Sequence, residues 1–270
     1  MEKYIWNCGL EASYISSRQN PRVVSTSKLA DKKYREQTGT FLCDGVKLTL
    51  EASLFGALKE VYIRESSAEN VLDAALAAKD AGGELFVLSD AAFDKITTEK
   101  SPQGIVAVAE CRSFSESQES FAEGKFILML DSVRDPGNLG TILRSACALG
   151  ASVALYSCAD LYNPRTVRAA MGALFKADVT VVRDGEEFVR SLVKKGRRVL
   201  AACPVGDSLI LGKDKVLPDD CVIIGNEGHG VSGNILDACT SSLLIPMEEN
   251  TESLNASAAA SVILWEYARR

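Results

Sequence analysis

Three short stretches in the second half of the chain carry polar residues where an apolar run gives way to a helical pattern. Because ligands of open α/β sheets bind beyond the carboxyl ends of the strands, the three stretches predict one shared site. An Arg side chain among them suits phosphate, since its planar fork matches phosphate geometry. The stretches are Asn138-Leu139-Gly140 with Arg144 and Ala146, then Gly225-Asn226-Glu227-Gly228, and then Pro246-Met247 followed by Glu252-Ser253-Leu254-Asn255-Ala256-Ser257.

The elements that must position these residues alternate regularly after residue 125. The run 126–130 is continuously apolar, as in a strand of a parallel sheet with both faces covered. Arg144 is expected in the first turn of a helix over 141–149. Further strands are predicted at 152–156, 179–182, 199–202, 222–225 and 243–245, with helices over 166–175, 186–195, 235–239 and 253–270. About six strands with crossover helices predict a doubly wound parallel sheet.

The first part of the chain reads as a smaller α/β/α layer. Helices are predicted near 28–37, 46–55 and 68–81, and strands at 41–43, 60–63, 85–88 and 104–109. A stretch from Arg112 to Ser120 is rich in Ser and Glu and poor in apolar residues, which is typical of a linker. We therefore expect a domain over 1–111, a linker over 112–124 and a second domain over 125–270.

Composition excludes several classes of protein. The longest uncharged run, 145–159, has 15 residues, fewer than the roughly 18 expected of a membrane span. The N-terminus lacks the apolar core of a signal peptide, so a cytoplasmic protein is expected. The eight cysteines lie at least 11 residues apart and there is one histidine, His229. We expect reduced thiols and no metal site, and a turn position for His229.

A local excess of positive charge lies near the N-terminus of this chain, whose net charge is −6. Two interpretations stay open at this point: a solvated helix face, or a surface that contacts the phosphates of a nucleic acid. The segment 18–35 has one acidic residue, Asp31, and six basic residues, which are Arg18, Arg22, Lys28, Lys32, Lys33 and Arg35.

The glycine-rich turns do not match a nicotinamide-binding loop. The order Gly-x-Gly-x-x-Gly is absent, and Gly225 to Gly230 has the reversed spacing after the fifth strand of the second domain rather than the first. A Rossmann dehydrogenase is therefore disfavoured.

Taken together, the three stretches resemble the three motifs of the TrmH-type (SpoU) branch of the SPOUT RNA methyltransferases. The matching positions are Asn138, Gly140, Arg144 and Ala146, then Gly225, Asn226, Glu227 and Gly228, then Pro246, Met247, Glu252, Ser253, Leu254, Asn255, Ser257 and Ala258. The first domain resembles, more loosely, the ribosomal-protein-like RNA-binding domain that many members carry. That second match rests on Asn20, Pro21, Lys28, Leu29, Arg35, Phe41 and Gly45.

The resemblance implies a parallel sheet with a deep trefoil knot, S-adenosylmethionine as cofactor, RNA as substrate, and a homodimer formed through the knotted domain. It implies catalytic roles for Asn138, Arg144, Glu227, Ser253 and Asn255. It implies cofactor contacts at Ala202, Cys203, Gly206, Ile224, Gly225, Asn226, Gly228, Gly230, Ile245, Met247, Leu254, Ser257 and Ala258.

Methylation of a ribose 2′-hydroxyl, most of all in ribosomal RNA, is the function that the resemblance favours. Arg144 is expected either as the base or as a phosphate clamp. The clamp is favoured because an arginine stays protonated at ordinary pH. Three alternatives stay open: a tRNA ribose methyltransferase, a base methyltransferase, and an RNA-binding assembly factor without activity.

Overall fold

The computed structural model describes residues 3–114, 124–203, 208–248 and 253–269. Contacts divide the chain into two compact units. The first comprises Met1–Arg112 and Tyr162–Phe175, and the second comprises Ser113–Leu161 and Lys176–Arg270. The predicted linker, 112–124, falls mostly on residues outside the described ranges. No helix within the described ranges has the length and apolar character needed to cross a bilayer.

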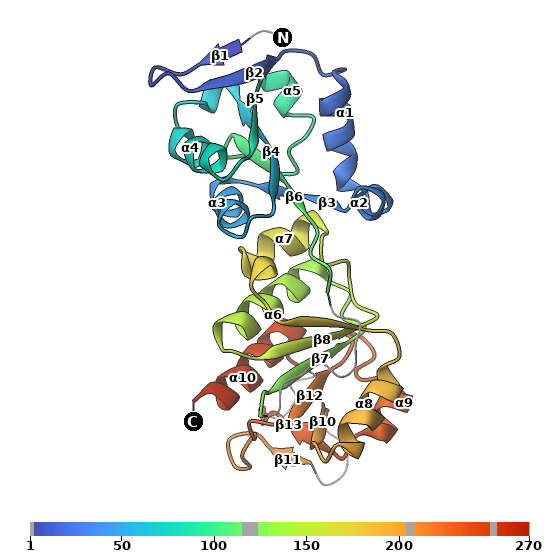
Figure 1. The fold of residues 1–270 in the computed structure, drawn as a ribbon. Helices are drawn as coiled ribbons and strands as arrows, with labels where there is room; N and C mark the ends of the chain where they lie inside the picture. Colours follow the sequence, from blue (N-terminus) through green and yellow to red (C-terminus); the bar gives the residue numbers. More distant parts are fainter. Residues whose placement is uncertain (1–2, 115–123, 204–207, 249–252, 270) are drawn as a thin grey trace. The chain divides into compact units, whose positions relative to one another are not determined.

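A six-stranded mixed sheet forms the centre of the first unit, in the order β1-β2-β5-β4-β6-β3 (Figure 1). β2–β5 and β5–β4 are parallel, whereas β1–β2, β4–β6 and β6–β3 are antiparallel. The strands are β1 (Lys3–Ile5), β2 (Glu11–Ile15), β3 (Thr40–Asp44), β4 (Leu58–Arg64), β5 (Glu84–Leu88) and β6 (Ile105–Glu110).

Helices cover both faces of this sheet because its strands bury side chains on both sides. Tyr62, Phe86 and Val108 point toward one face and pack with Val23 and Leu29 in a single cluster. Successive strand residues point to opposite faces, so the buried neighbours Val61, Val87 and Ala107 lie on the other face. The helical elements are α1 (Pro21–Ser27), η1 (Lys28–Ala30), α2 (Lys32–Thr38), α3 (Val46–Leu54), η2 (Glu65–Ser67), α4 (Leu72–Asp80) and α5 (Asp90–Phe93).

The helix expected near 28–37 is two elements, η1 and α2, and a further helix that was not expected, α1, precedes them. Asn20 caps α1, where its side chain accepts a hydrogen bond from the Arg22 amide and Pro21 occupies the first turn. Asp31 caps α2 through the amides of Lys33 and Tyr34. Two caps eleven residues apart start two separate helices. The hairpin of β1 and β2 was not predicted, because strands this short leave little alternation to read.

A segment from the second half of the sequence packs with the first unit. It contains α7 (Pro164–Ala170) and η3 (Ala173–Phe175), which replace the single helix expected over 166–175. The break falls at Met171 and Gly172, both with positive φ. The Phe41 ring lies 4.6 Å from the ring of Tyr162 and 5.9 Å from that of Phe175, measured between centroids.

The second unit contains a parallel sheet in the order β11-β13-β10-β12-β7-β8-β9 (Figure 1). This confirms the predicted sheet and adds the short β11. The strands are β7 (Ile127–Asp131), β8 (Ser152–Tyr156), β9 (Val179–Val182), β10 (Val199–Ala202), β11 (Leu209–Ile210), β12 (Cys221–Ile224) and β13 (Ser241–Leu244).

Four helices cover the two faces of this sheet. α6 (Pro136–Ala148) packs against α10 (Ala256–Ala268) on one face, and α8 (Gly185–Lys194) packs against α9 (Gly233–Ala238) on the other. α6 begins five residues earlier than expected, because Asp135 caps it and Pro136 fills its first position. Arg144 therefore lies in the third turn of α6, and its expected place in the first turn is wrong. The implied trefoil knot stays a prediction.

Candidate active site

The carboxyl ends of four neighbouring strands gather the three sequence motifs at one edge of the second sheet. β7, β12, β10 and β13 are consecutive and parallel. Their registers pair Leu130 with Ile224, Ile223 with Ala201, and Ala202 with Leu243. The loops that follow β7, β12 and β13 therefore start at nearly the same level, as the sequence predicted.

A chain of hydrogen bonds joins one residue from each motif. The Asn138 side-chain amide donates to Glu227 Oε1 at 3.0 Å. The Asn255 side-chain amide in turn donates to Asn138 Oδ1 at 3.0 Å. Glu227 also accepts from the backbone amides of Arg134 and Asp135, at 3.3 and 3.4 Å. We call Asn138, Glu227 and Asn255 the polar triad.

Helix caps hold two members of the polar triad in place. Asp135 accepts a hydrogen bond from the Asn138 amide at 2.8 Å, which fixes Asn138 in the first turn of α6. Asn255 caps α10 by accepting from the Ser257 and Ala258 amides at 2.9 and 3.4 Å. Capping side chains are restrained by these backbone bonds, so the site is partly preorganised.

The loop after β12 is held by Asn226. Its side-chain amide donates to the Ser132 carbonyl at 2.9 Å, and its oxygen accepts from the Gly228 and His229 amides at 2.9 and 3.2 Å. The two ends of the loop approach each other closely, since a Cβ on Gly225 would lie 2.0 Å from the carbonyl carbon of Gly230. Only glycine fits at position 225. His229 lies in this turn, with Nδ1 3.1 Å from Asn226 Oδ1.

Glu227 is ionised more readily than an ordinary glutamate. Its partial burial would raise the pKa, but hydrogen bonds from the Asn138 side chain and from the backbone amides of Glu227, Arg134 and Asp135 outweigh burial and lower the pKa. Hydrogen bonds to the charged form of a carboxyl have this effect. The site therefore presents a fixed negative charge at neutral pH.

Arg144 and Ser253 lie apart from the hydrogen bonds of the polar triad. Arg144 follows Asn138 by six residues, which is about 9 Å along the axis of α6 and about 120° around it. Its side chain is exposed and makes no hydrogen bond or ion pair with any described residue. Ser253 is also exposed, two residues before the cap of α10. Of the five predicted catalytic residues, three are hydrogen-bonded together within this chain.

The predicted cofactor residues lie at the same sheet edge, apart from Gly206, which is outside the described residues. Ala202 and Ile224 end β10 and β12. Met247 and Leu254 expose 42% and 38% of their surface there. A Cβ on Gly228 would have a single neighbour, Asn226 Oδ1 at 3.6 Å. Exposed apolar side chains beside glycine-rich backbone fit a nucleoside-bearing cofactor such as S-adenosylmethionine.

The sequence analysis missed Asp131, which ends β7. It is fully buried, and its Oδ2 accepts a hydrogen bond from the Ser232 amide at 2.7 Å. Its Oδ1 has no hydrogen-bond partner among the described residues. A signal was present, because an acidic residue that completes a buried apolar strand must have a structural or functional partner. Asp131 anchors the far end of the loop that contains Glu227.

The six basic residues of the segment 18–35 separate into three groups. Arg18, Lys28, Lys32 and Lys33 are exposed. Arg22 pairs with Glu60 at 2.6 Å and stacks 4.5 Å above the Phe86 ring. Arg35 is only 4% exposed and donates to the carbonyls of Leu29 and Ala30 at 2.7 and 2.8 Å. Arg35 is therefore a structural residue that no phosphate can reach, which corrects its expected role.

Comparisons with known proteins agree with this geometry. The family model described as SpoU rRNA Methylase family matches residues 125–265, and that of the MRM3-like substrate binding domain matches residues 20–107. The chain is 33% identical to the Bacillus subtilis 23S rRNA (guanosine(2553)-2'-O)-methyltransferase RlmP, over 93% of this chain and 97% of the relative. It is 33% identical to the 23S rRNA (uridine(2479)-2'-O)-methyltransferase of Streptomyces viridochromogenes, over 63% of this chain and 62% of that protein.

A solved structure supports the same assignment. The AdoMet-bound rRNA methyltransferase from Sinorhizobium meliloti superposes with a TM-score of 0.82 at 30% identity, covering 94% of this chain and 97% of that one. The fold, the motifs and the relatives thus agree over nearly the whole chain, and the protein belongs to the SpoU rRNA methylase family.

Proposed function

We propose that this protein methylates a ribose 2′-hydroxyl of 23S ribosomal RNA, with S-adenosylmethionine as the methyl donor. The observation that carries the proposal is the polar triad, which joins the three family motifs at the sheet edge where the cofactor residues also lie. Membership of the family and relatives that act on 23S rRNA support the substrate. Because the substrate is ribosomal RNA, we place the reaction in the cytoplasm.

In this reaction the protein mainly has to position the reacting atoms and to supply charged groups. S-adenosylmethionine supplies a methyl group on a sulfonium. The ribose oxygen would take that methyl group as the carbon–sulfur bond breaks, a neutral thioether would leave, and the hydroxyl proton would pass to water. Correct placement of the two reacting atoms contributes roughly 7–11 kcal/mol at best. Asn138, Asn255 and Ser253 would orient the ribose. The negative charge of Glu227 would hold the side-chain amide of Asn138 in place by accepting its hydrogen bond.

Arg144 is assigned as a phosphate clamp rather than as a base. Its guanidinium cannot accept a proton at neutral pH. No described acidic residue pairs with it, so its charge is free for a phosphate of the substrate. A cation that approaches the reacting ribose together with this phosphate would also stabilise the developing oxyanion.

A homodimer through α6 and α10 is part of the proposal. α10 exposes Ala258, Val262 and Trp265 at positions i, i+4 and i+7, with Val262 41% and Trp265 62% exposed. Such an apolar stripe on one helix face suits burial against a second copy. Sedimentation should give a dimer for the wild type and a monomer for Trp265→Glu. A monomeric wild type would contradict this arrangement.

The activity is tested with purified protein, methyl-labelled S-adenosylmethionine and 23S rRNA from cells that lack the gene. We expect label in a 2′-O-methyl nucleoside after complete digestion, and the guanosine that corresponds to position 2553 of the relative's substrate is the first to examine. Label in a base-methylated nucleoside, or none with any rRNA, would reject the proposal. Arg144→Ala should lower turnover by about 100-fold or more while cofactor affinity stays unchanged.

A further inference from the structure

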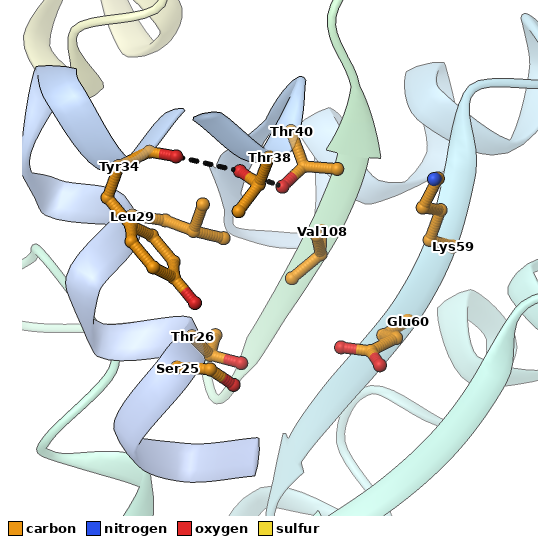
Figure 2. Close-up of a pocket in the computed structure, with 9 residues that line it drawn as sticks. All are labelled: Ser25, Thr26, Leu29, Tyr34, Thr38, Thr40, Lys59, Glu60 and Val108. Carbon is orange, nitrogen blue, oxygen red and sulfur yellow. Dashed lines mark hydrogen bonds between the residues drawn. The ribbon is translucent and has the colours of Figure 1, made fainter. Parts of the chain in front are cut away.

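The first unit contains a cavity that the family motifs do not explain. It encloses about 190 Å³ between the α1–α2 segment and the strands β3, β4 and β6 (Figure 2). Its floor is apolar, formed by Leu29 and Val108, and its walls are mostly polar. The lining residues are Ser25, Thr26, Leu29, Tyr34, Thr38, Thr40, Lys59, Glu60 and Val108.

Tyr34 presents an unused hydroxyl to this cavity. The ring is half-buried, and Figure 2 shows its hydroxyl directed toward the space in front of Thr26 and Glu60. No described residue forms a hydrogen bond with this hydroxyl, whereas the neighbouring hydroxyls are satisfied. Thr38 Oγ1 donates to the Tyr34 carbonyl at 3.0 Å, and Thr40 Oγ1 donates to Thr38 Oγ1 at 2.9 Å.

Glu60 supplies an acceptor on the opposite wall. Its Oε1 accepts from Arg22 at 2.6 Å and its Oε2 accepts from the Tyr62 hydroxyl at 2.7 Å. The Arg22 charge offsets that of the carboxylate. An ionised carboxylate has about four acceptor sites, so Glu60 has acceptor capacity left for a ligand with N–H groups.

One positive charge, that of Lys28, lies beside the Tyr34 ring. The Lys28 ammonium lies 5.8 Å from the centroid of the Tyr34 ring, and Lys28 is exposed. Lys32 and Lys33, at the start of α2, are exposed as well. A ligand that presents a ring to Tyr34 could therefore place an attached phosphate against Lys28.

We propose that this cavity receives one unstacked nucleobase of the RNA substrate, with its ring against Tyr34 and its phosphate near Lys28. The inference rests on the proposed function, because it assumes an RNA substrate. A volume of 190 Å³ is below the roughly 300–1,000 Å³ typical of sites for larger small molecules, and it suits a single ring system. Proteins recognise unpaired RNA in this way, by stacking on aromatic side chains and by hydrogen bonds to base edges.

The test measures binding of labelled single-stranded octamers, A8, C8 and U8, to the full chain across a range of salt concentrations. The wild type should bind all three octamers, because every base has a face that can stack on Tyr34 and an N–H group that can donate to Glu60. Tyr34→Leu should weaken A8 roughly tenfold without changing the salt slope, because stacking is lost and no phosphate contact is. Lys28→Ala should instead lower the slope. Failure of the wild type to bind any of the octamers, or unchanged A8 binding by Tyr34→Leu, would overturn the inference.

Two further variants keep the test decisive. Tyr14→Leu is the matched control, since Tyr14 is a half-buried tyrosine of the same unit whose hydroxyl donates to Glu65 and which does not line the cavity. It should bind A8 as the wild type does. If Tyr34→Leu does not fold, Ser25→Phe, which fills the cavity from its half-exposed wall, should weaken A8 to a similar extent. The octamers report no methyl transfer, so a protein that loses A8 affinity through Tyr34→Leu but leaves 23S rRNA unmethylated as the wild type would reject the proposed function and retain this inference.

Discussion

The polar residues of the second unit converge, whereas the basic residues of the first unit disperse. Asn138 and Glu227 are 89 positions apart, and Asn138 and Asn255 are 117 apart, yet hydrogen bonds of 3.0 Å join them. The six basic residues within 18–35 are neighbours in sequence, but one is buried, one is paired with acids, and four are exposed.

The difference lies in what fixes each side chain. The ends of adjacent parallel strands lie at one edge whatever the length of chain between them, so residues at those ends meet. In a helical segment the direction of a side chain depends on its place in the turn. Arg35 lies on the inward face of α2 below η1, and its charge is used to bind carbonyl groups.

The largest expected effect tests how closely the two ends of the loop after β12 approach each other. Gly225→Ala places a Cβ 2.0 Å from the Gly230 carbonyl carbon and 2.2 Å from the Val231 nitrogen, so backbone must move. We expect a loss of roughly 3 kcal/mol in the free energy of unfolding and loss of cofactor binding. Denaturant unfolding and cofactor titration measure the two.

Gly228→Ala is the control for that loop. Its Cβ would meet only Asn226 Oδ1, at 3.6 Å, and its φ is not positive. Stability should therefore stay within about 0.5 kcal/mol of the wild type. Equal losses in the two variants would show that the loop is not held by the contact between Gly225 and Gly230.

The second-largest expected effect is a difference in stability between two variants of the first unit, one at the buried Arg35 and one at the exposed Lys33. Arg35→Ala removes the donor from the buried carbonyl of Leu29 and from the partly buried carbonyl of Ala30, and should cost about 2 kcal/mol in unfolding free energy. Lys33→Ala, two positions earlier on the exposed side of α2, should change stability by less than about 0.5 kcal/mol. If Arg35→Ala unfolded like the wild type, the division of the basic residues would be wrong.

Sequence patterns predicted most of the second unit because its signals are strong. Some of the buried parallel strands are continuous apolar runs, as in Ile127–Leu130, and the connections between most strands are long enough for a helix. The start of α6 was missed because its first turn, Pro136 to Leu139, reads as a glycine-rich turn. Its cap, Asp135, and the following Pro136 are the signals that place the start correctly.

The remaining features depend on tertiary structure. That Arg35 is buried follows from the fold of η1 over α2, which no charge pattern reports. The sequence also does not predict that Tyr162 and Phe175 pack with Phe41, because the helical pattern of a segment does not indicate which unit the segment packs with. The cavity beside Tyr34 needs three strands and two helices to exist, so only coordinates reveal it.

A smaller effect measures how the polar triad is coupled. In a double-mutant cycle of Asn138→Ala and Glu227→Gln, the coupling energy should be roughly 1 kcal/mol, since one hydrogen bond to a charged group is shared. Additive losses would mean that the two residues act independently despite their contact.

The same carboxyl gives a test by pH. The pKa of Glu227 is lowered in the folded protein, so its ionised form stabilises the fold above the ordinary value of 4.5, and this contribution disappears as the pH falls through the lowered pKa. The stability difference between the wild type and Glu227→Gln should therefore be full at pH 7 and should shrink below pH 4.5. A difference that stayed constant down to pH 3 would exclude an ionised Glu227 as the cause.

The smallest effect concerns the dispersed cations that remain exposed. Lys32→Ala and Lys33→Ala should each lower the slope of log affinity against log salt by about 0.7 if the residue contacts a phosphate of single-stranded RNA. Lys32 is 3.7 Å from Glu36, an exposed pair worth little, so its charge remains available to RNA. Lys79, in the last turn of α4, is the control and should leave the slope unchanged when replaced by Ala. If all three variants shared the wild-type slope, the segment 18–35 would be a solvated helix face, and the convergent site would then have to bind RNA without that surface.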